Sequence, residues 1–146
     1  MRDLKNMKYL IDTNIILDVL LKREPFCSCA VKVIKLSMYD KFRFYISASS
    51  VTDIYYIANQ TLRNRAQVKN LINKLLQIVS IAGVSEKEIR NALMLSWSDF
   101  EDSVQYSVAL LQEMDGIITR NTKDYKESEI KIWEPEEFLE TVLNSL

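Results

Sequence analysis

Apolar residues along the chain form short runs, which are separated by longer stretches where apolar positions recur every three or four residues. The short runs are typical of buried strands, and the longer repeat is typical of helices that bury one face. The predicted strands cover residues 8–11, 44–46, 78–81, 116–119 and 130–132. Four helices are predicted over residues 15–21, 25–39, 51–63 and 66–77. Three more are predicted further along the chain: one begins after Ser85, one extends from Ser98 to about Glu113, and one begins at Pro135.

Strands alternate with helices along the chain, which favours a parallel sheet covered by helices on both faces. We therefore expect a three-layer α/β/α fold with a short, mainly parallel central sheet. The 146 residues fit a single domain over residues 1–146, and no internal repeat is visible. In such folds the ligand binds in the crevice at the carboxyl ends of the strands. Asp12 and residues 119–121 both stand at this end of predicted strands.

Local signals predict how several helices begin and which faces they bury. A serine followed three residues later by an acid is typical of a capping box, and this spacing occurs in Ser50 with Asp53, Ser85 with Glu88 and Ser98 with Glu101. The helical repeat predicts a buried face with Ala30, Val33, Ile34 and Met38 in one helix and with Phe100, Val104, Val108 and Leu111 in another. In the second of these helices, Glu101, Gln105 and Gln112 fall on the predicted solvent face.

Composition narrows the chemistry that the chain can perform. The chain has 19 basic and 20 acidic residues, a formal net charge of −1, whereas a protein that holds nucleic acid through a broad basic surface is strongly basic. If this chain handles RNA, bound cations and a local basic rim must supply the positive charge. The sequence has no histidine, which excludes Ser-His-Asp and Cys-His catalysis and ordinary histidine-ligated zinc.

The two cysteines and the apolar runs bear on where the protein works. Cys27 and Cys29 stand two apart on nearly opposite sides of a predicted helix, so they cannot easily pair with each other. We expect both to be small buried residues in a reducing compartment. No apolar run reaches the roughly 18 residues of a membrane span, and the sequence opens without the pattern of a secretory leader. These features predict a cytoplasmic protein that makes no membrane contact.

Asp12 and Asp53 each stand where an acid could either cap a helix or form part of a site. Asp12 ends an otherwise apolar strand, and an Asp in front of a helix commonly caps it. Asp53 fits a capping box, although its own helical face carries the apolar residues Tyr56 and Ile57. Both interpretations stay open for each residue on this evidence alone.

Asp99 and Asp102 lie three apart on one predicted helix, where first-turn acids offset the helix dipole. Asp99 does not lie on the polar arc of that helix, so its carboxylate needs a partner, and a cation is the obvious one. All of these acids begin helices that should start near the same edge of the sheet, where converging carboxylates repel one another. Oxygen ligands without histidine select Mg²⁺ or Mn²⁺ over zinc, and such ions activate water and orient phosphates in many nucleases.

Three segments of the chain resemble motifs of a known family. They are residues 10–14 (Leu-Ile-Asp-Thr-Asn), Asp102 near the start of a helix, and residues 117–125 (Ile-Ile-Thr-Arg-Asn-Thr-Lys-Asp-Tyr). In order and spacing they are similar to the PIN-domain ribonucleases, and the resemblance extends from about Lys8 to Phe138. Small single-domain members of this family are commonly VapC-type toxins of bacterial and archaeal toxin–antitoxin pairs.

Carried over position by position, the resemblance implies that Asp12, Asp53 and Asp102 are the first three acids of the family's site. The fourth place falls on Asn121, which removes one charge and leaves open whether one or two metal ions bind. The resemblance implies that the three Asp residues hold Mg²⁺ or Mn²⁺ directly or through water, with Asp99 a less secure ligand.

Several residues beside the motifs have roles that the resemblance fixes less closely. Thr13 or Thr119 would orient ligands through hydroxyl hydrogen bonds, and Asp115 fits better in the turn before a strand than in the site. The candidates for contacts with RNA phosphates are Arg120, Lys123, Arg63 and Arg65. Each of these four has the alternative of a solvated surface charge.

The implied activity is hydrolysis of RNA phosphodiester bonds by an endoribonuclease toxin, with RNA as substrate, a cognate antitoxin protein as partner, and a homodimer as the assembly. Apolar residues in 17–21 and 26–38 are candidates for antitoxin or dimer contacts, with core packing as the alternative. A second interpretation is a catalytically weak PIN-like module that binds RNA or protein, which Asn121 and the slight acidic charge favour. A phosphohydrolase or phosphoacceptor domain is disfavoured, because position 14 holds Asn where a DxD motif has its second Asp.

Overall fold

The computed structural model describes residues 7–145 of the chain. Its strands are β1 (Met7–Ile11), β2 (Phe42–Ser47), β3 (Ser80–Ala82), β4 (Gly116–Ile118) and β5 (Lys131–Trp133). Its α-helices are α1 (Thr13–Leu20), α2 (Cys27–Lys35), α3 (Ala48–Leu62), α4 (Arg65–Leu75), α5 (Glu86–Met94), α6 (Phe100–Leu111) and α7 (Pro135–Leu143), and short 3₁₀ helices cover Leu36–Met38 and Thr122–Tyr125. Within this described range, no helix is long and apolar enough to cross a membrane.

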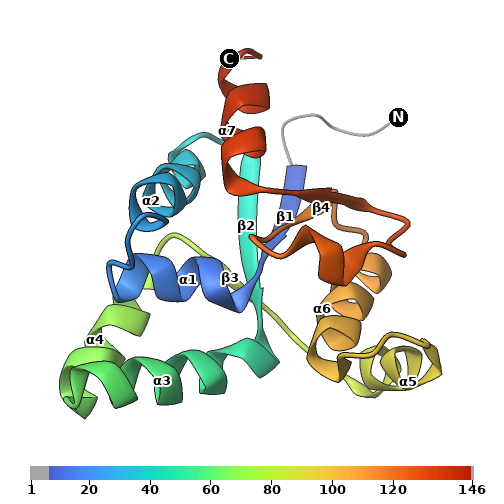
Figure 1. Ribbon diagram of the computed structural model, residues 1–146, viewed down its shortest axis with the longest axis horizontal. Helices are drawn as coiled ribbons and strands as arrows, with labels where there is room; N and C mark the ends of the chain where they lie inside the picture. Colours follow the sequence, from blue (N-terminus) through green and yellow to red (C-terminus); the bar gives the residue numbers. More distant parts are fainter. Residues whose placement is uncertain (1–6, 146) are drawn as a thin grey trace.

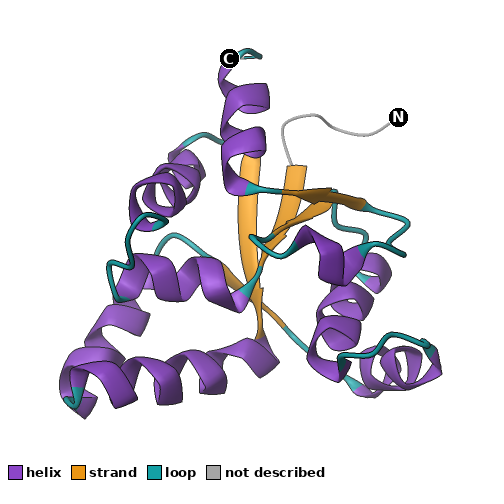
Figure 2. Ribbon diagram, viewed as in Figure 1, coloured by secondary structure: helices purple, strands orange, loops and turns teal. Residues whose placement is uncertain are grey.

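The strands form one sheet in the order β3-β2-β1-β4-β5, and every neighbouring pair is parallel. Helices cover both of its faces, with α1, α2, α3, α4 and α7 on one side and α5 and α6 on the other (Figure 1, Figure 2). The predicted three-layer α/β/α fold is confirmed, and the sheet among the described residues is wholly parallel.

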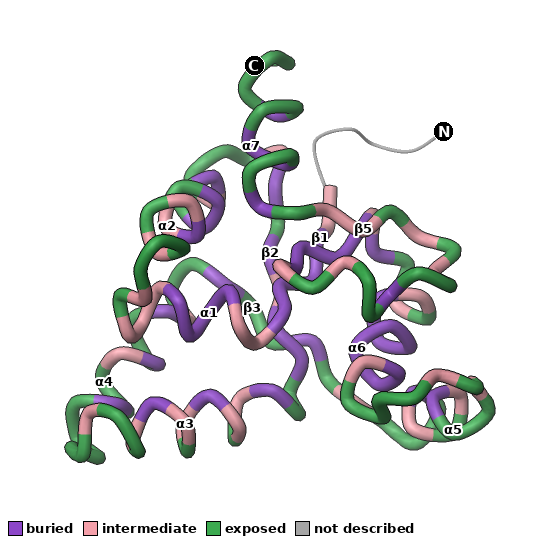
Figure 3. Tube along the Cα trace, in the orientation of Figure 1, coloured by how far each residue is buried: buried purple, intermediate pink, exposed green. Residues whose placement is uncertain are grey.

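Side chains alternate across the central strand β1, so this strand feeds two separate cores. Tyr9 and Ile11 belong to the core beneath α1, α2, α3, α4 and α7, whereas Leu10 belongs to the core beneath α5 and α6. On the first face, Tyr9 packs edge-on against Phe138, with the ring centroids 4.8 Å apart. Figure 3 shows that buried residues follow the central strands, whereas α3 and α5 expose their outer sides. Because both faces are covered, the strand ends are the part of the sheet that stays open to a ligand.

One predicted capping box is confirmed and another is wrong. At the start of α5, the Ser85 backbone N–H donates to Glu88 Oε1 at 2.7 Å, as the spacing predicted. Helix α3 begins one turn earlier than expected, because Ser47 at the end of β2 caps it by accepting a hydrogen bond from the Ser50 backbone N–H. Ser50 therefore lies inside the helix, where its hydroxyl is free for other contacts.

The helix predicted over residues 25–39 is shorter than its apolar pattern indicated. Its α-helical part ends at Lys35, and the chain continues as the 3₁₀ helix Leu36–Met38. The tighter turn rotates the side chains that follow it, so that Met38 is 76% exposed instead of lying on the predicted buried face. Cys27 and Cys29 are half-buried and not, as expected, fully buried.

Candidate active site

A cavity of about 540 Å³ is lined by residues at the carboxyl ends of β1 and β4 and at the starts of α1, α3 and α6. Figure 1 shows where these strands and helices lie in the fold. Six acids line it, namely Asp12, Asp53, Asp99, Glu101, Asp102 and Asp124. Neutral polar side chains complete most of the wall, namely Thr13, Asn14, Ser49, Ser50, Gln105 and Asn121. Among the residues that the structure describes, no lysine or arginine lines this cavity. The predicted edge of the sheet therefore carries a concentration of negative charge.

Asp12 is both a helix cap and part of the cavity wall. It precedes α1 in an extended conformation, and its Oδ1 accepts a hydrogen bond from the Thr13 backbone N–H at 2.8 Å. Its Oδ2 accepts a hydrogen bond from Thr119 Oγ1 at 2.7 Å, which joins the ends of β1 and β4. Burial raises the pKa of Asp12 above its ordinary value in spite of these hydrogen bonds. The two interpretations left open by the sequence are thus compatible.

Asp53 reaches the cavity from α3 and meets an acid that the sequence pattern had assigned to solvent. The pKa of Glu101 is raised to about 7, first because it forms a hydrogen bond with Asp53, then because it is partly buried, and then because other carboxylates lie nearby. The hydrogen bond to Asp53 and the negative charges nearby both disfavour ionisation of the Glu101 carboxyl. Asp53 is therefore a site residue in geometry, and Glu101 belongs with it.

Asp102 and Asp99 stand on the first turn of α6 with different roles. Asp99 caps the helix, its Oδ1 accepting from the Asp102 backbone N–H at 3.1 Å, so the cap predicted at Ser98 is wrong by one residue. Asp102 is half-buried, and burial, followed by the charges of neighbouring acids, raises its pKa to about 7. Tyr125 Oη donates to Asp102 Oδ1 at 3.4 Å, which opposes this rise only weakly.

The segment after β4 supplies Asn121 and Asp124. The Asn121 backbone N–H donates to Thr119 Oγ1 at 3.0 Å, so this hydroxyl links Asn121 to Asp12. Asp124 lies three residues further on, in the 3₁₀ helix Thr122–Tyr125, and its charge contributes to the raised pKa of both Asp12 and Asp102. Asp124 was not among the predicted site residues, although its place in the motif at residues 117–125 was a signal for it.

Gln105 was wrongly assigned to the solvent face because α6 is not an ordinary amphipathic helix, whereas Glu101 is exposed, as predicted, and also lines the cavity. Residues 103–109 are buried without a break, since the helix packs against the sheet and α5 and also borders the cavity. An all-round buried helix has no solvent arc for periodicity to find. Consequently Gln105 is only 4% exposed, whereas Phe100 and Leu111 of the predicted core face are 49% and 37% exposed.

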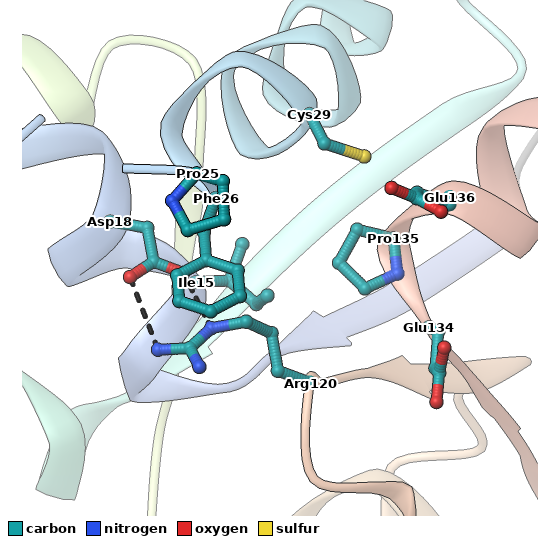
Figure 4. Close-up of a pocket in the computed structure, with 9 residues that line it drawn as sticks. All are labelled: Ile15, Asp18, Pro25, Phe26, Cys29, Arg120, Glu134, Pro135 and Glu136. Carbon is teal, nitrogen blue, oxygen red and sulfur yellow. Dashed lines mark hydrogen bonds and ion pairs between the residues drawn. The ribbon is translucent and has the colours of Figure 1, made fainter. Parts of the chain in front are cut away.

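The basic residues predicted to contact phosphate lie outside the acidic cavity. The Arg120 guanidinium faces a second cavity of about 320 Å³, where Nε donates to Asp18 Oδ2 at 2.7 Å and Nη2 donates to Asp18 Oδ1 at 3.2 Å (Figure 4). The guanidinium also lies 3.8 Å from the centre of the Phe26 ring. Lys123 lines a separate cavity beside Trp97. The geometry therefore gives Arg120 a structural partner.

Three further candidates lie away from the cavity. Arg63 and Arg65 flank the turn between α3 and α4, at the opposite end of α3 from Asp53. Asp115 Oδ2 accepts a hydrogen bond from the Lys8 backbone N–H at 2.7 Å, at the amino ends of β1 and β4. The interpretation of Asp115 as a residue of the turn before the strand agrees with this position.

The donor set of the cavity fits a hard divalent cation. All of its charged groups are carboxylates, and its neutral groups are hydroxyls and amides, which are oxygen donors that Mg²⁺ accepts. The pKa values of Asp12 and Asp102 are raised first by burial, and that of Glu101 first by its hydrogen bond with Asp53, and neighbouring carboxylates add to all three shifts. No basic side chain among the described residues lines the cavity to offset this negative charge. Within residues 7–145, no group of three or more acidic or cysteine side chains is arranged to hold a metal ion by itself. The oxygen donors that line the cavity are of the kind that Mg²⁺ binds, together with water molecules.

Solved structures with the same fold include VapBC2 from Rickettsia felis bound to a DNA fragment from its promoter, with a TM-score of 0.67, 17% identity, and coverage of 88% of this chain and 100% of that chain. VapBC-1 from nontypeable Haemophilus influenzae has a TM-score of 0.67, 19% identity and coverage of 89% and 99%. VapC20 from Mycobacterium tuberculosis, a toxin that cleaves the Sarcin-Ricin loop, has a TM-score of 0.59, 14% identity and coverage of 75% and 86%. At these identities the likeness establishes the fold alone.

The sequence itself supplies the family. No curated protein matches the chain. The sequence profile of the PIN domain matches residues 8–123, which run from β1 to the segment that carries Asn121. This range contains the acidic cavity except for Asp124. The chain belongs to the PIN domain family.

Proposed function

We propose that this protein is an endoribonuclease that depends on Mg²⁺ or Mn²⁺ and hydrolyses RNA phosphodiester bonds. The observation that carries the proposal is the cavity at the carboxyl edge of the sheet, with six carboxylic acids and no basic side chain among the described residues. A nucleic acid is a polyanion and would be repelled by such a cavity, unless cations occupy it. Family membership and the Sarcin-Ricin loop cleaving activity of VapC20 favour RNA as the substrate.

Asp12, Asp102 and the Asp53–Glu101 pair would hold the cation, with water completing its coordination. A bound divalent cation would supply Lewis acidity, which polarises the phosphodiester and acidifies a water molecule. The chain's own contribution is to hold the acids in place. Thr119 Oγ1 and the Thr13 backbone N–H fix both oxygens of Asp12, and Tyr125 Oη faces Asp102. Since no histidine is present, no dedicated imidazole base takes part.

We also propose that the protein acts as the toxin of a toxin–antitoxin pair and binds a cognate antitoxin. The support is that proteins with the same fold were solved as VapBC complexes and as a toxin–antitoxin complex from Klebsiella pneumoniae. The homodimer stays a prediction of the sequence analysis. Co-expression with the protein of an adjacent reading frame, followed by co-purification, tests the antitoxin.

A catalytically weak PIN-like binding module is the second candidate, and one observation favours it. Asn121 stands where the resemblance implies a fourth acidic position, so the cavity lacks one charge there. To separate the two functions, the purified chain is incubated with structured RNAs, including a Sarcin-Ricin loop oligonucleotide, in Mg²⁺, in Mn²⁺ or in EDTA. Cleavage that EDTA abolishes supports the enzyme. Retention of RNA in a gel-shift assay, with no cleavage under any condition, supports the binding module and overturns the proposed activity.

A further inference from the structure

The side chain of Gln105 is held at one end of its amide by a chain of hydroxyl groups. It lies in the cavity wall about one helical turn after Asp102 and is 4% exposed. Gln105 Oε1 accepts a hydrogen bond from Ser50 Oγ at 3.5 Å. Ser50 Oγ in turn accepts from Thr13 Oγ1 at 3.0 Å and lies 2.8 Å from Ser47 Oγ. These contacts direct Oε1 toward the start of α3 and leave Nε2 on the other side of the amide.

The other end of this amide is a buried donor without a partner. Gln105 Nε2 is buried and has no hydrogen-bond partner among residues 7–145. A buried N–H that makes no hydrogen bond costs free energy, so such groups are rare and call for an explanation. Asp12 is an acceptor in the same cavity wall, and a side-chain hydrogen bond from Gln105 is among the causes that lower the pKa of the Asp12 carboxyl.

The hydrogen bonds of Asp12 leave room for one further donor and one cation. Oδ1 accepts from the Thr13 backbone N–H and Oδ2 accepts from Thr119 Oγ1. An ionised carboxylate offers about four lone-pair positions, so two stay available. If Gln105 Nε2 takes one of them, a single position is left for a ligand in the cavity. Three donors around one carboxylate would then set the direction in which Asp12 can bind a cation.

We propose that Gln105 is a positioning residue for Asp12, which donates from Nε2 to the Asp12 carboxylate when the cavity holds its cation. The inference rests on the proposed function, because it concerns the same cation site. Gln105 would not touch RNA, since Nε2 is shielded from solvent by the surrounding side chains. Residues that hydrogen-bond to metal-ligating groups typically change metal affinity or activity by about 10- to 100-fold when they are replaced.

The test compares Mn²⁺ binding by the purified wild-type chain with binding by Gln105→Leu, using the electron paramagnetic resonance signal of free Mn²⁺ in the absence of RNA. Gln112→Leu is the matched control, because Gln112 lies at the end of the same helix and donates to the Gly83 carbonyl at 2.8 Å, away from the cavity. We expect Gln105→Leu to weaken Mn²⁺ binding by about tenfold or more and Gln112→Leu to leave it unchanged. At saturating Mn²⁺, the KM for RNA should not change in either variant.

The same Mn²⁺ affinity in the wild type and in Gln105→Leu would overturn the inference and leave the proposed function standing. If Gln105→Leu does not fold, Ser50→Ala decides the question by the same measurement, because it releases Oε1 and lets the amide turn. Weaker Mn²⁺ binding by Ser50→Ala supports the positioning role, and unchanged binding overturns it. A wild-type chain that binds no Mn²⁺ would refute the proposed cation site itself, together with the role of Gln105.

Discussion

The ion pair between Asp18 and Arg120 gives the sharpest prediction about stability. It joins residues 102 positions apart in the sequence, on α1 and on the segment directly after β4. The same segment places Asn121 in the cavity wall, and its Thr119 donates a hydrogen bond to Asp12. The ion pair therefore joins one wall of the candidate site to the helix that Asp12 caps. Loss of either partner should loosen this wall, but the two losses should not cost the same.

The difference follows from the unequal exposure of the two side chains. Asp18 is 0% exposed and Arg120 is 24% exposed, and Arg23 Nη1 lies as far as 3.9 Å from Asp18 Oδ1. Removing one partner of a buried pair costs about 3–5 kcal/mol, because a charge is left without compensation. Solvent near Arg120 reduces this figure, so we expect about 3 kcal/mol for Arg120→Leu. Asp18→Asn should cost about 1–2 kcal/mol, because Asn still accepts a hydrogen bond and Arg120 can turn toward water.

Urea unfolding of both variants, and of the double variant Asp18→Asn/Arg120→Leu, measures these free energies. A loss of about 3 kcal/mol corresponds to a fall in Tm of about 6–12 °C for a chain of this size. The double variant should be more stable than Arg120→Leu alone, because it buries no unpaired charge. If Asp18→Asn costs more than Arg120→Leu, or if the single effects simply add, the pair does not act as described.

Other predictions concern pH and packing. Without a divalent cation, burial and neighbouring charges raise the pKa of Asp102 to about 7. Between about pH 4 and pH 7 the folded state therefore keeps a proton on Asp102 that the unfolded state has lost. The free energy of unfolding should fall as the pH rises through this range. Thermal unfolding in EDTA at several pH values checks this, and Asp102→Asn should flatten the profile; a rise in stability over that range would contradict the assignment. A Cβ at Gly116 would lie 2.8 Å from the Lys131 carbonyl oxygen. Gly116→Ala should therefore lower the free energy of unfolding, measured in urea, by about 1–3 kcal/mol. An unchanged urea midpoint would show that β5 can move aside. Phe138 is fully buried against Tyr9, so Phe138→Ala should cost about 3–5 kcal/mol, and a loss below about 1 kcal/mol would mean that α7 is not part of the core.

The parts of the fold that the sequence predicted are those in which local signals agree. The apolar run of β1 ends at Asp12, and the run of β4 ends just before Thr119, so the two strand ends and their acid-lined edge could be recognised. The start of α3 could not be recognised from the sequence, because Ser47, Ser49 and Ser50 are all suitable caps. Tertiary position decides among them, since Ser47 ends a buried strand while Ser50 turns its hydroxyl toward Gln105.

The rest depended on contacts that a linear pattern does not contain. Asp18 stands within an otherwise apolar helical stretch, which was a signal that it needs a buried partner, but nothing in the sequence pointed to Arg120. In the same way, Gln105 has the polarity of a surface residue and lies in a helix that is buried all round. The hydrophobic pattern therefore assigned it to solvent, although it borders the cavity that six acids line.

The proposed role of Asp12 in a cation site at which RNA is cleaved can be tested by the initial rate of RNA cleavage in Mn²⁺. The proteins compared are the wild type, Asp12→Asn and Glu140→Gln, a variant that neutralises an exposed acid on α7. We predict cleavage by the wild type and by Glu140→Gln at similar rates, and a rate lower by about 100-fold or more for Asp12→Asn. Undiminished cleavage by Asp12→Asn, with the preparations free of other nucleases, would contradict the account.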